Sequence, residues 1–222
     1  MKEYISICQA CPLFRELSAG DIEQALCCMD ARARTYADGE CIFLAGQPVS
    51  RIGVVLEGGV QVLREDYDGN RTILTKLWPG ELFGEAFACA AGDKRLPVTV
   101  LSEGGAVLLL DYRRLVAACP SACSFHTQLV ENMLAILAEK NLLLNRRLGH
   151  LSRRTTRDKL LSYLREQAAL QNGGEFVLPF NRQELADYLC VERSALSAVL
   201  GKLRDEGVLQ FKRNRFTLIS PQ

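Results

Sequence analysis

The chain has 222 residues, of which 48% are hydrophobic and 24% are charged, with a formal net charge of +1. This composition is typical of one or two globular domains, and the absence of any run of 18 or more apolar residues excludes a membrane-spanning helix. The first residues, MKEYISICQACPLF, lack the apolar core of a signal peptide, so we expect a cytoplasmic protein.

The N-terminal half is predicted to be a short helix followed by a β-barrel. Residues 17–30 have helical character, with Ser18 as the cap and Asp21 at the third position. From Thr35 to Asp111, short β-like runs are separated by glycines: ECIFLAG, RIGVVLEG, VQVLRED, RTILTKL, VTVLSEG and AVLLLD. The segment EDYDGNRT is predicted to be a hairpin turn. Many short strands at regular spacing favour a jelly-roll-like barrel, whose mouth can hold a small ligand.

A long helix is predicted from Ser124 to Leu151. It carries a heptad pattern of about three repeats, which is typical of a dimer seam, and Asn141 at an a position favours a parallel dimer. The seam residues are Val130, Leu134, Leu137, Asn141, Leu144, Leu148 and Leu151. A second stripe, Leu129, Met133, Ile136 and Leu143, is expected to face the barrel. The alternative is one amphipathic helix packed inside a monomer.

The C-terminal segment contains two helices joined by a very short break. Thr155 or Thr156 is expected to cap a preceding helix from Arg157 to Gln167, and FVLPF to form a short strand. In the stretch NRQELADYLCVERSALSAVLGKLRDEGVL, Asn181 and Glu184 have the spacing of a capping box. Two apolar faces follow at helical period, Leu185, Ala186 and Leu189, then Leu196, Val199, Leu200 and Leu203. Gly207 ends the second helix, so the pattern predicts a helix-turn-helix.

The second of these helices has the features of a recognition helix. Its buried leucines leave Arg193, Ser194, Ser197 and Ala198 on the opposite face near the N-terminus, where base edges are read. Lys202 lies further along the helix and is expected to contact DNA as well. The following segment VLQFKRNRFTLI predicts a hairpin wing, with Lys212, Arg213, Asn214 and Arg215 at its tip.

The distribution of charge agrees with DNA binding by the C-terminal part. Residues 151–222 contain 12 Lys and Arg against 8 Asp and Glu, whereas the remainder has 15 against 18. Basic side chains are required for contact with the phosphate backbone, so the basic excess is found where the helix-turn-helix lies. An ordinary helical hairpin with a solvated charged face is the alternative interpretation.

A barrel, a dimer helix and a winged helix-turn-helix in this order resemble the CRP/FNR family of bacterial transcription regulators over nearly the whole chain. The motifs that carry the resemblance are PGELFGEAF and RQELADYLCVERSALSAVLGKLRDEGVL. It implies an α+β fold with a cyclic-nucleotide-binding-like jelly-roll barrel at residues 1–123, a dimerisation helix at 124–151 and a winged helix-turn-helix at 152–222. It also implies double-stranded DNA, a second copy of the chain and RNA polymerase as partners.

The same resemblance assigns roles to residues of the helix-turn-helix and the wing, which together are called the reader below. Arg193 matches a base-reading arginine, while Arg182 and Gln183 match positions that contact phosphates. Ser194 and Ala198 stand where many members of the family have Glu and Arg, so the usual half-site is not transferred. Cys190 occupies a turn position where Gly is frequent, and we expect a strained or differently shaped turn.

The resemblance implies an effector site in the barrel, formed by Gly84, Glu85 and Arg95. Leu96 stands where the cyclic-nucleotide pocket has Ser, and Leu142 and Leu143 stand where the dimer helix would bind adenine. Losing several polar contacts from a buried site costs roughly 1–3 kcal/mol each. We therefore expect an effector other than cyclic AMP, more apolar and with an anionic group for Arg95. A surface arginine paired with Asp93 or with solvent is the alternative.

The nine cysteines leave a redox or metal sensor of the same family open. Cys8 and Cys11 form a C-x-x-C pair, but the next cysteine is Cys27, which is distant for an iron–sulfur cluster. Cys119 and Cys123 lie one helical turn apart. Small apolar fillers are the simpler interpretation, so no metal site is assigned and the cofactor stays unknown.

Haem and enzyme chemistry find little support in the residue types. The chain contains two histidines, His126 and His150, and His126 is interpreted as a polar helix residue rather than a haem ligand. The predicted barrel contains no histidine, although a cupin-like metal enzyme needs His and carboxylate ligands there. No nucleophile motif or phosphate-binding loop is present, so we expect a regulator and not an enzyme.

Overall fold

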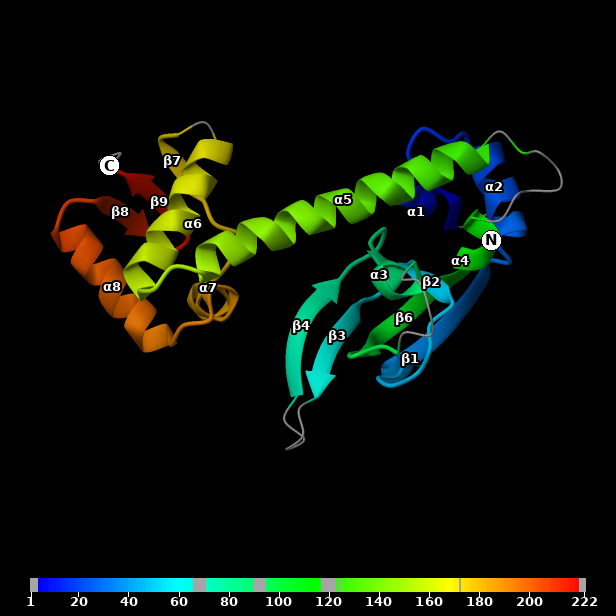
Figure 1. Cartoon of the computed structure of the whole chain (residues 1–222), viewed down its shortest axis with the longest axis horizontal. Coiled ribbons are helices and arrows are strands. Elements are labelled where there is room, and N and C mark those ends of the chain that lie inside the picture. The colour runs from blue at the N-terminus through cyan, green and yellow to red at the C-terminus, as the bar shows by residue number, and fades with distance from the viewer. Residues whose placement is uncertain are drawn as a thin grey trace. The chain divides into compact units, whose positions relative to one another are not determined.

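The computed structural model describes residues 4–65, 71–89, 95–116, 123, 125–171 and 173–219. They divide into two compact units, residues 1–139 and 140–222, with the boundary inside the long helix α5 (Phe125–Leu151). Figure 1 shows the barrel strands and short helices of the first unit and the helices with a small sheet of the second. The α+β class, the jelly-roll-like barrel, the long helix and the C-terminal helix-turn-helix are thus confirmed.

Three short helical segments precede the barrel. They are α1 (Ile5–Ala10), the 3-10 turn η2 (Pro12–Phe14) and α2 (Ala19–Cys28). The Ser18 side chain accepts a hydrogen bond from the Asp21 amide, and the Asp21 carboxylate accepts one from the Ser18 amide. This capping box begins α2 where the sequence predicts it.

The barrel is an antiparallel, nearly closed sheet. Its strands are β1 (Arg32–Phe43), β2 (Arg51–Val55), β3 (Val60–Glu65), β4 (Arg71–Leu77), β5 (Leu82–Phe83) and β6 (Thr99–Asp111). The order is β4-β3-β6-β2-β5, and β1 also pairs with β6. Two short helices, α3 (Glu85–Ala88) and α4 (Tyr112–Val116), follow β5 and β6. Of the predicted hairpin turn EDYDGNRT (residues 65–72), residues 66–70 lie outside the described residues. Glu65 and Arg71 on either side of them pair in adjacent strands.

Strand β6 is one continuous element, whereas the sequence predicts two strands separated by Gly104. Gly104 and Gly105 have φ of +80° and +125°, so both adopt backbone conformations that favour glycine. A Cβ on Gly105 would lie 2.2 Å from the Glu57 carbonyl oxygen. The glycine pair therefore permits a close approach of two backbones within the sheet, and does not end the strand.

The first half of α5 covers one face of the barrel. Leu129, Met133 and Ile136 are buried in the same core as the helices α1 and α2 and the β6 residues Leu108 and Leu110. The alternate β6 residues Val107 and Leu109 face a separate cluster inside the barrel. The predicted barrel-facing stripe is confirmed for its first three residues. It is wrong for Leu143, which lies in the second unit and is 54% exposed.

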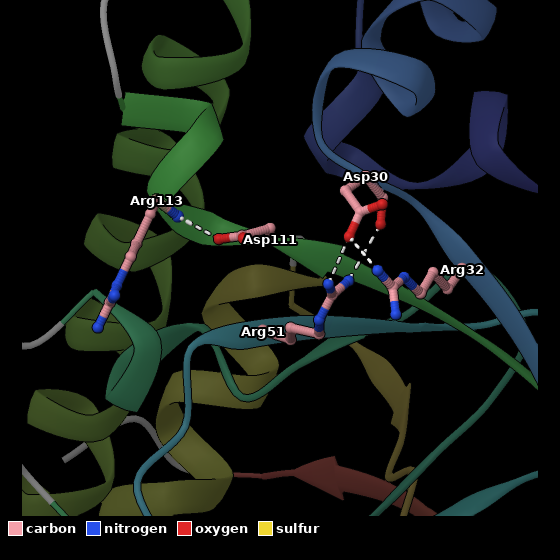
Figure 2. A network of polar contacts seen from close by, with 5 residues as sticks. All are labelled: Asp30, Arg32, Arg51, Asp111 and Arg113. Atoms are coloured by element: carbon pink, nitrogen blue, oxygen red, sulfur yellow. Dashed lines mark hydrogen bonds and ion pairs between the residues drawn. The ribbon is translucent and has the colours of Figure 1, made fainter.

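Polar contacts fix this helix and the corner before β1. The buried Asn132 side chain donates to the carbonyls of Leu13 and Arg15, both at 2.9 Å. Figure 2 shows the corner itself, where Arg51 donates to the Asp30 carbonyl at 3.0 Å and to its carboxylate at 2.6 Å. Arg32 lies 2.9 Å from the same carboxylate.

Figure 2 also shows, at the labelled residues Asp111 and Arg113, how β6 passes into α4. The Arg113 backbone N–H donates to the Asp111 carboxylate at 3.0 Å, so the last residue of the strand caps the turn of chain that follows. The Asp111 amide in turn donates to the Met29 carbonyl at 2.9 Å. Strand β6 is therefore joined to the corner that carries Asp30.

The second unit contains α6 (Thr156–Leu170), α7 (Arg182–Leu189), α8 (Arg193–Asp205) and a sheet of three strands. The strands β7 (Glu175–Val177), β8 (Leu209–Lys212) and β9 (Arg215–Leu218) are antiparallel in the order β7-β9-β8. Their shared core includes Leu160, Tyr163, Leu164, Phe176, Leu185, Leu196, Leu200, Leu203 and Phe216. Thr155 caps α6, one of the two caps predicted.

Candidate nucleic-acid interface and effector site

Helix α7 begins as the sequence predicts. The Asn181 side chain accepts a hydrogen bond from the Glu184 amide at 3.0 Å, and the Glu184 carboxylate accepts one from the Asn181 amide at 2.7 Å. Leu185, Ala186 and Leu189 are fully buried, so one face of α7 lies against the core.

The turn between the two helices is three residues long and ends α7 with an unusual backbone. Cys190 has φ 50° and ψ 58°, the left-handed conformation, which costs an L-residue roughly 1–2 kcal/mol. Its amide donates to the Asp187 carbonyl at 3.2 Å, and the Val191 amide donates to Ala186 at 3.0 Å. The expected strain at the position of this cysteine is confirmed.

Helix α8 has one buried and one exposed face. Leu196, Leu200 and Leu203 are at most 1% exposed. The residues predicted to face DNA are all exposed: Arg193, Ser194, Ser197, Ala198 and Lys202. Gly207 follows the helix with φ +72°, in agreement with its predicted role as a terminating glycine. The recognition-helix arrangement is therefore present, with the arginine in the first turn.

The strands β8 and β9 form the predicted wing. Lys212 pairs with Arg215 across the turn, and Arg213 in the turn has φ 57°. The side chains of Lys212, Arg213 and Arg215 are exposed, and Arg215 lies 2.9 Å from Glu175 on β7. The turn thus carries a group of exposed basic side chains after the recognition helix.

Arg182 has a structural contact that the sequence pattern does not indicate. Its guanidinium lies 4.8 Å from the ring centroid of Phe211 and 5.1 Å from that of Phe216, and it donates to the Arg213 carbonyl at 3.2 Å. Burial lowers the pKa of this half-buried arginine. Arg182 therefore joins the first turn of α7 to the wing, whereas the neighbouring Gln183 is exposed and bonded to Asp187.

The last turns of α5 are attached to this reader by residues that were not predicted. The Arg147 guanidinium lies 4.9 Å from the ring centroid of Tyr188 and donates to its carbonyl at 3.2 Å. His150 is 5% exposed, with Nδ1 2.9 Å from Ser162 Oγ and Nε2 2.5 Å from Glu166. No local sequence signal identifies such pairs, because the partners are 12 to 41 residues apart.

The predicted dimer seam divides into exposed and half-buried residues. Leu134, Leu144 and Leu148 are 62%, 65% and 63% exposed, which is unusual for leucine. Val130 and Leu137 are half-buried against the barrel core. Asn141 is exposed, and its side-chain oxygen accepts from Asn145 at 2.8 Å.

The predicted effector residues lie in loops and a short helix of the barrel. Gly84 has φ +80° and precedes α3, in which Glu85 is 4% exposed. Arg95 is exposed and donates to the Gly46 carbonyl at 3.3 Å, and Leu96 is 2% exposed. Leu142 belongs to the second unit, where it is 58% exposed. Asp93, the alternative partner of Arg95, lies outside the described residues.

The N-terminal pair Cys8 and Cys11 does not have the environment of reactive thiols or metal ligands. Cys8 and Cys11 are at most 1% exposed, and burial raises the pKa of the Cys8 thiol to about 11. Within the described residues, no group of three or more His, Cys, Asp or Glu is arranged to hold a metal ion. Cys119 lies outside these residues. None of the described helices is both long enough and apolar enough to cross a membrane.

Two family models match the two parts of the chain. The cyclic nucleotide-binding domain matches residues 33–119, and the Crp-like helix-turn-helix domain matches residues 158–222. The first range begins at the second residue of β1 and includes the other barrel strands. The second begins at the third residue of α6 and includes α7, α8 and the wing.

Two known proteins are similar to this chain along most of their length. The Cyclic AMP receptor protein of Thermus thermophilus is 27% identical over 201 residues, which cover 90% of this chain and 88% of that protein. The CRP-like protein Clp of Xanthomonas campestris is 26% identical over 204 residues, covering 87% and 85%.

Solved structures have the same fold. That of the c-di-GMP responsive global regulator CLP of Xanthomonas campestris has a TM-score of 0.61 at 22% identity, and covers 92% of this chain and all of that one. The structure of CprK complexed with OCPA has a TM-score of 0.66 at 15% identity, covering 90% and 91%.

Proposed function

Because this chain belongs to the CRP/FNR family of transcription regulators, we propose that it is a homodimer that reads DNA under the control of a small molecule held in the barrel. The chain is a DNA-binding regulator with a cyclic-nucleotide-binding domain, and its family is one of regulators rather than enzymes. The observation that carries the proposal is the exposed N-terminal face of α8, opposite its buried leucines.

In the proposed DNA complex, Arg193 reads one guanine in each half-site. Arg is the side chain best suited to guanine O6 and N7, and its place in the first turn of α8 is where recognition helices reach base edges. Ser194 and Ser197 line the same face. Arg182, Gln183, Lys202 and the wing residues Lys212, Arg213 and Arg215 contact phosphates, which supply affinity without sequence preference.

The proposed homodimer is formed through α5. Leu134, Leu144 and Leu148 are largely exposed, and burying leucine against a second copy is favourable by about 1.5–3 kcal/mol for each side chain. Val130 and Leu137 border this stripe, and Asn141 sets the register. A dimer also places two recognition helices on half-sites about 34 Å apart.

The effector proposed for the barrel is an anionic molecule other than cyclic AMP, bound near Gly84, Glu85 and Arg95. One relative is named for cyclic AMP and one similar structure for c-di-GMP. Leu96 stands where the family's cyclic-nucleotide pocket has Ser, and it is buried. A more apolar effector suits these residues better. Binding would shift the dimer between two arrangements for which it has different affinity.

The experiment that tests this function begins with selection of DNA from a random duplex library by the purified full-length protein. We expect the selected site to be two-fold symmetric. Transcription from a template with that site then measures whether the protein recruits or excludes RNA polymerase. Sedimentation of wild type and of Leu144→Glu on α5 distinguishes the dimer from a monomer. The control is Leu170→Glu, which replaces an exposed leucine on α6. Selection of no DNA would contradict the proposal.

The effector is sought on the same sample. Anaerobic purification followed by absorbance spectra, metal analysis and native mass spectrometry would reveal a retained molecule or chromophore. Titration of cyclic AMP into the protein with its selected DNA then tests the barrel. Strong activation by cyclic AMP would contradict the argument from Leu96, and a bound metal would favour the redox sensor.

A further inference from the structure

An open cleft of about 630 Å³ lies where the end of α5 is followed by α6, within the second unit. The connecting residues Ser152, Arg153 and Arg154 form one side of it, and the outer face of α6 forms the other. This volume falls in the range of about 300–1,000 Å³ that small-molecule sites occupy. The cleft includes neither the predicted barrel site nor the recognition face of α8.

The face of α6 that lines the cleft is fixed by the packing of the helix. Asp158, Leu161, Ser162 and Arg165 have the spacing of one helical face. The opposite face carries Leu160, Tyr163 and Leu164, which are at most 2% exposed in the core of the unit. Arg165 is therefore held at the cleft by the burial of its neighbours.

The cleft has an excess of positive charge. Among the residues that the structure describes, none of Arg153, Arg154 and Arg165 lies within 4.0 Å of a carboxylate, and all three are exposed. Asp158 is the acidic residue of the lining.

Two further carboxylates near the ends of α6 already have cationic partners. Glu166 lies 2.5 Å from His150 and 3.5 Å from Arg146. Glu206 lies 2.7 Å from Arg157. Three guanidinium groups in the cleft are thus opposed by one carboxylate.

We propose that this cleft binds phosphate groups. Guanidinium groups match phosphate oxygens in paired hydrogen bonds, and three of them around one concave surface can neutralise two or more negative charges. The phosphate can belong to a small phosphorylated molecule or to the DNA backbone beside the recognition site. The second source rests on the proposed function, whereas the first does not.

The position of the cleft connects binding to the attachment of α5. Ser162 lines the cleft and also contacts buried His150 at the end of that helix. A ligand that bridges Arg153 or Arg154 to Arg165 ties the connecting segment to α6 across this contact. Binding is therefore expected to slow amide exchange in residues 148–156.

The first experiment uses pyrophosphate as the probe and the full-length protein without DNA. Isothermal calorimetry on wild type is compared with Arg154→Gln and Arg165→Gln, and each substitution is expected to weaken binding about 10-fold. Asp158→Asn should strengthen it, because the opposing charge is removed. Arg34→Gln, an exposed arginine on β1, is the charge-matched control and should leave binding unchanged.

The second experiment measures the salt dependence of binding to the selected DNA for the same variants. A shallower slope for Arg154→Gln and Arg165→Gln than for Arg34→Gln assigns the cleft to backbone phosphates. Circular dichroism checks that each variant is folded. The proposal is overturned if pyrophosphate does not bind and the DNA slopes are equal. If wild type selects no DNA, the proposed function fails, while the pyrophosphate titration still tests the cleft.

Discussion

The imidazole Nε2 of His150 lies 2.5 Å from the Glu166 carboxylate, so the final turn of α5 is held to α6 by a polar pair with a buried ring. The ring also meets Tyr163 edge-on, with centroids 5.6 Å apart. Burial raises the pKa of Tyr163, and the nearby Tyr188 and Glu166 charges contribute to that rise. The attachment therefore combines apolar packing with polar contacts.

Glu166→Ala should destabilise the protein by about 1–3 kcal/mol, because the buried His150 ring loses the carboxylate that lies 2.5 Å from its Nε2. Glu175→Ala is the matched control, since its exposed pair with Arg215 is worth about 0–1 kcal/mol. Urea unfolding followed by circular dichroism measures both. Equal losses would mean that the His150 contact contributes no more than a surface pair.

Arg193→Ala should weaken binding to the selected site by about 1–3 kcal/mol and relax the preference at one base pair. Lys202→Ala should weaken all sequences by the same factor, because a phosphate contact carries no sequence information. Gel-shift titrations against every substitution of the half-site make the comparison. A uniform loss for Arg193→Ala would place this arginine on the backbone instead.

Cys190→Gly should stabilise the second unit by about 0.5–1 kcal/mol, because glycine adopts φ 50° without the steric cost of a Cβ. Cys190→Ala keeps that cost and loses the thiol, so it separates backbone strain from the chemistry of sulfur. Hydrogen exchange of the α7 and α8 amides reports the difference. Stabilisation by alanine as well would attribute the effect to the side chain.

Acid should weaken the corner at Asp30. The Arg51 hydrogen bond first, and then the Arg32 hydrogen bond, hold the pKa of this carboxyl below its usual value. A lowered folded-state pKa stabilises the fold above the unfolded pKa of about 3.9, and this contribution is lost as pH falls through the folded value. The free energy of unfolding of Asp30→Asn, measured by urea unfolding, should therefore differ most from that of wild type near neutral pH. The difference should be smallest in acid.

The two arginines provide the control for that assignment. Arg51→Gln should raise the Asp30 pKa further than Arg32→Gln, because Arg51 makes the larger contribution and donates twice to this residue. Carboxyl NMR titration of the two variants measures both shifts. The reverse order would show that Arg32 dominates in solution.

The reader was predictable from sequence because its signals are local. A capping box at Asn181, leucines at helical period and the glycine at 207 each lie within a few residues of the feature they determine. The predicted helix-turn-helix and wing therefore agree with the structure. The strained turn at Cys190 was expected from the family resemblance, because a helix-turn-helix often has glycine at this turn position.

The remaining features depend on contacts between distant segments. Gly104 indicates a turn when it is considered alone, and its place inside β6 follows from the approach of Glu57 and Gly58. Arg182 over Phe211 requires the wing to fold back onto α7. The basic cleft had a partial signal in the Arg153–Arg154 pair, but Arg165 joins it only once the buried face of α6 is known.

Helix α8 carries the residues that stabilise the fold and the residues proposed to contact DNA on separate sides. Leu196, Leu200 and Leu203 fill the core, while Arg193 and Ser197 are exposed. Substitutions on the exposed side can alter the preferred operator without loss of folding, so relatives that share this scaffold can diverge to control different genes through a few surface changes. Because the exposed face can change without the buried face, α8 is a suitable element to redesign when a regulator with a new target is engineered.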